Sequence, residues 1–221
     1  MKIKKSLVIC LLIMMLMPMR ANAFSWGDFF RALFGLGTTE TTTADMATIT
    51  KDATATLSDL EKQSVTLDKE TQTAFISLVS TISSKDDAVT IKSNLEKANA
   101  LTDAAKRNSA INKVYSDYAT TLNNNKVELL VIFRLLTESE KTTLTSAIKT
   151  LSAKGEAYSN LAKKCNDTYK NIMNKTSYKD DRESTLKQVS DAAAMYTTKA
   201  TVIKTLATEA KIFAKLGGIK I

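Results

Sequence analysis

The sequence predicts an all-α protein, an elongated antiparallel bundle of about four long heptad-patterned helices preceded by a short amphipathic N-terminal helix. Between Thr38 and Leu216 there is no proline and a single glycine, Gly155. Because proline costs roughly 3 kcal/mol and glycine about 1 kcal/mol in a helix interior, this stretch lacks the residues that break helices. Apolar or small residues also recur through it at alternating steps of three and four, the pattern of packed helices.

Residues 1–23 have the layout of an export signal. Lysines at positions 2, 4 and 5 precede an apolar run over residues 7–17, and Ala21 and Ala23 supply the small residues of a cleavage site. A membrane-spanning helix needs about 20 apolar residues, so this run is too short to be an anchor. We expect cleavage after Ala23 and a periplasmic or extracellular mature protein.

Residues 24–37 form an aromatic amphipathic segment, which a Thr-rich linker, residues 38–43, joins to the rest of the chain. Four of its large apolar residues follow the spacing i, i+3, i+4 and i+7 of one helix face. The candidate residues for contact with a membrane or a partner protein are Trp26, Phe29, Phe30, Leu33, Phe34 and Leu36. The alternative is that this segment folds back and closes one end of the bundle.

Residues 44–216 are the predicted helical bundle, and each long helix has an apolar seam, meaning the residues expected to face the other helices. The first seam is Met46, Ile49, Ala53, Leu57, Leu60, Ser64, Leu67, Thr71, Ala74, Leu78 and Ile82. Asp86 can cap the second helix. The second seam is Ala88, Ile91, Leu95, Ala98, Leu101, Ala105, Ile111, Val114, Tyr118 and Leu122.

Two features separate the second helix from the third. Asn123 to Asn125 are either a turn or a weak point in a helix. The apolar patch over residues 127–136 is too short to span a bilayer, and we expect it to be buried at a helix junction rather than to act as an insertion element.

The third and fourth helices have clear start and stop signals. Thr137 and Glu140 form a capping box, so a helix begins there and ends near Asn174. Gly217 and Gly218 end the last helix and leave residues 217–221 as a C-terminal tail. The third seam is Leu144, Ile148, Leu151, Gly155, Tyr158, Ala162, Cys165, Tyr169 and Ile172. The fourth is Leu186, Val189, Ala193, Tyr196, Ala200, Ile203, Ala207, Ala210 and Ala214.

The composition argues against an enzyme. The chain has no histidine, and Cys165 is the one cysteine left after export, which removes His-dependent catalysis and His-based metal sites. The adjacent carboxylates Asp86-Asp87 and Asp180-Asp181 lie where helices are expected to start, where they satisfy backbone N–H groups. Cys165 lies on a seam, as a small core residue does. We expect no catalytic, metal or cofactor site.

The charges are unevenly distributed along the mature chain. Acidic residues outnumber basic ones over residues 24–140, and basic residues outnumber acidic ones over residues 141–221. The favoured interpretation is that helices from the two halves lie side by side, and the alternative is a basic surface for anionic lipid or an acidic partner. No dense basic cluster is present, so we expect no nucleic-acid binding.

These features favour a non-enzymatic exported helical-bundle protein that serves as an interaction or structural component of the bacterial envelope, such as an adhesin, a periplasmic accessory or a secretion-apparatus component. The expected partner is an envelope protein or the membrane surface, reached through residues 24–37. The alternative is a membrane-active or pore-forming helical bundle, or a helical lipid carrier. The pattern does not set the oligomeric state.

Overall fold

The computed structural model describes residues 43–175 and 181–221, and these residues form six α-helices and no strand. The all-α prediction is therefore confirmed for this part of the chain. The helices are α3 (Thr43–Ile82), α4 (Lys85–Asn99), α5 (Ala104–Asn124), α6 (Lys126–Leu135), α7 (Glu138–Lys175) and α8 (Asp181–Leu216). They belong to one compact unit, Thr39–Ile221. The predicted export signal, aromatic segment and most of the linker lie outside the described residues.

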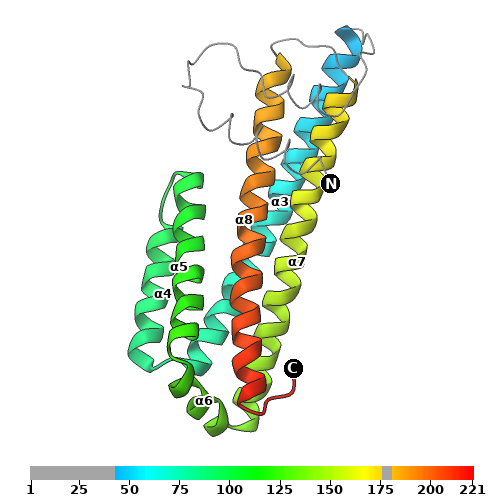
Figure 1. Ribbon diagram of the computed structural model, residues 1–221. Coiled ribbons are helices and arrows are strands. Elements are labelled where there is room, and N and C mark those ends of the chain that lie inside the picture. The colour runs from blue at the N-terminus through cyan, green and yellow to red at the C-terminus, as the bar shows by residue number, and fades with distance from the viewer. Residues whose placement is uncertain (1–42, 176–180) are drawn as a thin grey trace, which may run out of the picture. The chain divides into compact units, whose positions relative to one another are not determined.

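Three long helices, α3, α7 and α8, pack along one another (Figure 1). Helix α7 runs antiparallel to α8, and at Gly155 the two backbones approach closely, since a Cβ there would lie 3.4 Å from the backbone nitrogen of Lys204. Helix α7 is also antiparallel to α3, where Lys154 pairs with Glu70 and Tyr158 bonds to Asp68. Small residues on the predicted seams thus allow close helix contact.

The prediction of one continuous second helix, with its seam from Ala88 to Leu122, is wrong. This segment is divided into α4 and α5, which lie side by side as a hairpin (Figure 1). Leu101, a predicted seam residue, is 39% exposed at the connection. The break is stabilised locally, because Asp103 Oδ1 accepts a hydrogen bond of 2.8 Å from the Lys106 N–H and caps α5.

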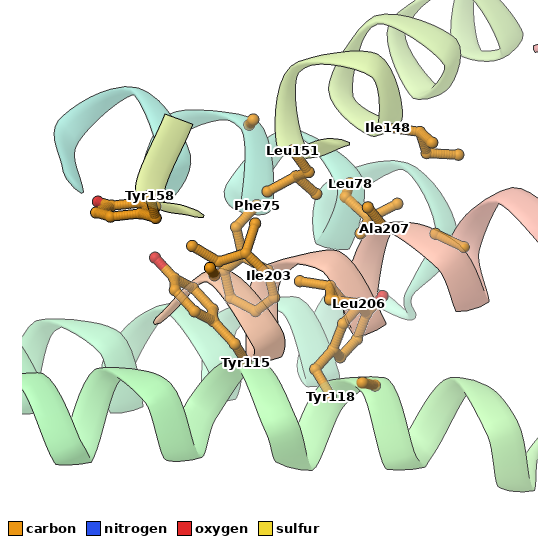
Figure 2. Packing of buried hydrophobic residues seen from close by; sticks show 14 of the residues in the cluster. Phe75, Leu78, Tyr115, Tyr118, Ile148, Leu151, Tyr158, Ile203, Leu206 and Ala207 are labelled. Carbon is orange, nitrogen blue, oxygen red and sulfur yellow. The ribbon is translucent and has the colours of Figure 1, made fainter. Parts of the chain in front are cut away.

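The hairpin covers only part of the length of the three long helices. Phe75 of α3 packs edge-on against Tyr115 and Tyr118 of α5, with ring centroids 4.7 and 5.5 Å apart. Figure 2 shows these three rings in one cluster with Ile203 and Leu206 of α8. Where α3 has neighbours on two sides it buries a wide face, made of Ala74, Phe75, Leu78, Val79 and Ile82.

The seam predictions for α3, α7 and α8 agree with the burial of their side chains. All predicted seam residues of α7 and α8 are buried or half-buried, and so are those of α3 whose side chains are described. Burial goes beyond the seams at Phe75, Tyr115, Lys199, Leu206 and Phe213. The three-and-four pattern therefore predicts the residues at the centre of each contact face but not those at its edges.

The cap of α4 differs from the prediction, and the asparagine segment separates two helices. Ser84, not Asp86, caps α4, since its hydroxyl accepts from the Asp87 N–H at 3.1 Å. Asp86 and Asp87 lie in the first turn instead. The three asparagines contain a true break, because α5 ends at Asn124 and α6 begins at Lys126.

The capping box at the start of α7 is confirmed. The Thr137 N–H donates to Glu140 Oε2 at 2.8 Å, and the Glu140 N–H donates to Thr137 Oγ1 at 3.3 Å. These backbone and side-chain bonds from Thr137 lower the pKa of the Glu140 carboxyl. Thr137→Ala should destabilise the protein by about 1 kcal/mol, read from the urea midpoint. Thr120→Ala, which changes an exposed threonine within α5, is the control and should leave the midpoint nearly unchanged; an equal effect of the two substitutions would refute the capping role.

The two C-terminal glycines have different structural roles. Gly218 has a φ of 86°, and the Ile219 N–H bonds to the Ala214 carbonyl at 2.9 Å while the Gly218 N–H bonds to Lys215 at 3.0 Å. This is a Schellman stop, and it places Ile219 in the core. At Gly217 a Cβ would lie 2.4 Å from Cβ of Phe133, so α6 and α8 touch there.

Substitution of these glycines should separate the two roles. Gly217→Ala should destabilise the protein by more than about 1 kcal/mol, because the buried Phe133 must move. Gly218→Asn should be tolerated, since asparagine accepts a positive φ and the space around Gly218 is open. Thermal unfolding of both variants measures the difference, and equal stability of the two would contradict the close contact between α6 and α8.

Candidate functional site

A buried ion pair joins two of the three long helices. Lys199 of α8 is only 3% exposed, and its Nζ lies 2.6 and 2.9 Å from the two carboxylate oxygens of Asp68 on α3. A lysine ammonium is rarely buried unless it is paired, because removal from water is costly. The pair therefore ties α3 to α8 at this level.

Tyr158 brings the third long helix into the same cluster. Its hydroxyl donates to Asp68 Oδ1 at 2.5 Å, and the Lys199 ammonium lies 5.4 Å from the centre of its ring. The ring also stacks on Tyr196, with centroids 6.4 Å apart. A single carboxylate thus receives hydrogen bonds from α7 and α8, and the cluster connects all three long helices.

Two tyrosines near Asp68 have raised pKa values. Burial, reinforced by the negative charge of Asp68, raises the pKa of the Tyr158 hydroxyl, and the same two causes raise the pKa of Tyr115. Both phenols therefore stay neutral to a higher pH than an exposed tyrosine does. Asp68 accepts from donors on α7 and α8, so these hydrogen bonds help to hold the three long helices together.

Buried phenols should make the protein sensitive to alkali. Burial raises the pKa of Tyr118 from 10.0 to about 12, so its neutral form is favoured in the folded state. This stabilisation is fully present below pH 10 and is lost as pH rises to about 12. The free energy of unfolding should fall across that window, measured by urea titration. Tyr118→Phe should make the fall shallower, and an unchanged pH slope in this variant would contradict the assignment.

A groove lies beside the ion pair, between α3, α5 and α8. Its volume is about 630 Å³, and its walls include Leu57, Val65, Ile111 and Met195 together with Asp68 and Lys199. Its lining also includes Gln72 and Asn99, whose side-chain amides bond to each other at 2.9 and 3.1 Å. Its walls mix apolar side chains with charges of both signs, which does not select one class of ligand.

Helix α6 presents a second feature, an exposed apolar stripe. Val127, Val131 and Leu135 are 78%, 55% and 77% exposed and recur every four residues. On the opposite side, Leu129 and Phe133 are buried. The expectation that residues 127–136 are buried at a helix junction is thus correct for one face of α6 and wrong for the other.

The residues singled out from the sequence have different outcomes. Trp26, Phe29, Phe30, Leu33, Phe34 and Leu36 lie outside the described residues. Cys165 is fully buried, and burial raises the pKa of its thiol, which agrees with a core residue. Asp68 and Lys199 were missed. A signal was available for Lys199, which lies three residues after Tyr196 and four before Ile203 and so falls on the apolar face of its helix.

The comparisons with known proteins give no relative. No family model matches the chain, and neither a curated protein nor a solved structure matches it. Among the described residues, no group of three or more His, Cys, Asp or Glu side chains is placed to hold a metal ion. None of the described helices is long and apolar enough to cross a membrane.

Proposed function

We propose that this chain is a non-enzymatic, exported helical protein that serves as an interaction or structural component of the bacterial envelope. In this proposal residues 1–23 direct export, and residues 24–37 form a short amphipathic helix that contacts an envelope protein. The long helices act as a rigid support for that contact.

The observation that carries the proposal is the use of the buried polar groups for packing. Asp68, Lys199 and Tyr158 satisfy one another across three helices. A catalytic acid or base needs a proton or lone pair that is open to a substrate, and a pKa near the working pH. In this cluster Asp68 accepts from Tyr158 and Lys199, and Lys199 is only 3% exposed, which favours a supporting role.

The charge distribution supports the same proposal. Among the described residues, two ion pairs between helices connect the acidic first part of the chain with the basic second part, Asp68 with Lys199 and Glu70 with Lys154. Some of the opposite charges of the two halves therefore form ion pairs between neighbouring helices. This agrees with the favoured interpretation of the charge asymmetry, although exposed lysines remain on α7 and α8.

Photocrosslinking in intact cells tests the proposal. A photoreactive phenylalanine analogue at Phe30 should give one discrete adduct with an envelope protein, and the same analogue at Asn160, an exposed residue in the middle of α7, should not. Intact-mass measurement of the protein from the envelope fraction should show loss of residues 1–23. Adducts with lipid alone, or retention of residues 1–23 in a cytoplasmic protein, would refute it.

A further inference from the structure

We propose that the outer face of α6, together with the C-terminal turn of α8, lies on an anionic lipid surface. The first argument is the exposed stripe of Val127, Val131 and Leu135. Its aliphatic side chains follow one another at i, i+4 and i+8 on a helix whose other face is fixed by Leu129 and Phe133. The packing of Leu129 and Phe133 therefore fixes the helix so that the stripe faces solvent.

The second argument is the charge around the stripe. The segment of residues 126–136 carries Lys126, Arg134 and Glu128, and the contact of Gly217 with Phe133 joins it to the last turn of α8. The last two turns of α8 and the tail add the exposed residues Lys211, Lys215, Lys220, Ile212 and Leu216, and the one acidic residue of this stretch, Glu209, is half-buried. Basic residues with exposed aliphatic side chains are typical of surfaces that bind anionic membranes.

Basic residues outnumber acidic residues at this end. Glu138 accepts a hydrogen bond of 2.7 Å from Lys141, whereas the capping box lowers the pKa of Glu140 and so favours its charged form. With Glu128 and Glu209 these are four carboxylates, and the basic residues are Lys126, Arg134, Lys141, Lys211, Lys215 and Lys220.

Helix α6 is too small for the two other obvious occupants. It has 10 residues and is about 15 Å long, whereas a stable dimer buries roughly 800 Å² per partner, more than so short a helix offers. It is also half the length of about 20 residues that a bilayer span requires. A helix of this size with one aliphatic face suits the boundary between lipid headgroups and acyl chains.

An environment-sensitive fluorophore on α6 tests the inference. The chain lacking residues 1–23 is labelled through Val131→Cys, and in a second sample through Asn160→Cys in the middle of α7; Cys165 is buried and does not react. With vesicles of phosphatidylcholine and phosphatidylglycerol, the probe at position 131 should brighten and shift to the blue. The labelled protein should bind vesicles of pure phosphatidylcholine at least about tenfold more weakly. The probe at position 160 should not respond.

Two sets of variants separate the apolar and the electrostatic contributions. Val127→Asn with Leu135→Asn, both at exposed positions, should weaken vesicle binding at least about tenfold. Lys215→Gln with Lys220→Gln should do the same at low salt and have little effect at high salt. Far-UV circular dichroism should show both proteins folded.

Three results would overturn the inference. The first is a silent probe at position 131 in the presence of anionic vesicles, and the second is an equal response at position 160. The third is a signal at position 131 that rises with protein concentration without vesicles, which would indicate a second copy of the chain on α6. The inference is independent of the proposed contact through residues 24–37, because anchoring by that segment alone leaves the probe on α6 in water.

Discussion

Asp68→Ala should lower the free energy of unfolding by about 3–5 kcal/mol, because it leaves the Lys199 ammonium buried without its counter-charge. Lys199→Ala should be milder, since the Asp68 side chain is 32% exposed and still accepts from Tyr158. Urea unfolding followed by far-UV circular dichroism measures both values.

Matched variants show whether the pairing itself is responsible. The double variant Asp68→Leu with Lys199→Met should be more stable than Asp68→Ala, since an apolar pair of similar size removes the buried charge. Asp59→Ala removes a carboxylate of the same helix that forms an exposed pair with Lys62, and it should change stability by less than about 1 kcal/mol. If Asp68→Ala and Asp59→Ala have equal effects, the ion pair does not hold the helices together.

Phe75→Ala should lower the free energy of unfolding by about 3–5 kcal/mol, because a fully buried ring is lost and a cavity remains. Since this ring contacts Tyr115 and Tyr118, the loss should loosen the hairpin most. Hydrogen exchange should therefore accelerate more in α4 and α5 than in α7.

A substitution at an exposed position of α3 provides the control. Val65 is exposed, so Val65→Ala should leave both stability and exchange nearly unchanged. Uniform acceleration in all helices of Phe75→Ala would show that the hairpin does not have its own attachment to α3.

Helix identity could be predicted from the sequence because it depends on local chemistry. The lack of proline, the capping box at Thr137 and Glu140, and the positive φ of Gly218 are properties of a few neighbouring residues. The hairpin break was missed although it has a local signal, Asp103, whose carboxylate caps α5. Leu101 continues the three-and-four pattern across the break, and this pattern favoured one continuous helix.

The buried ion pair was beyond sequence reasoning for a related physical reason. Lys199 falls on an apolar face, which signals an unusual environment, but its partner is 131 positions away. Choosing Asp68 among the carboxylates requires the rotation of α3 relative to α8, which side-chain packing sets. The exposure of Val131 likewise depends on what α6 packs against and not on its own apolar pattern.

The distance between Thr90 and Lys113 tests the architecture most directly, because it separates a packed α4–α5 hairpin from one continuous helix. Both residues are exposed, so spin labels can be attached through cysteine substitutions while Cys165 stays buried. Hairpin packing of α4 on α5 predicts a pulsed-EPR distance of less than about 20 Å. A distance near 35 Å, that of one continuous helix at about 1.5 Å per residue, would contradict it.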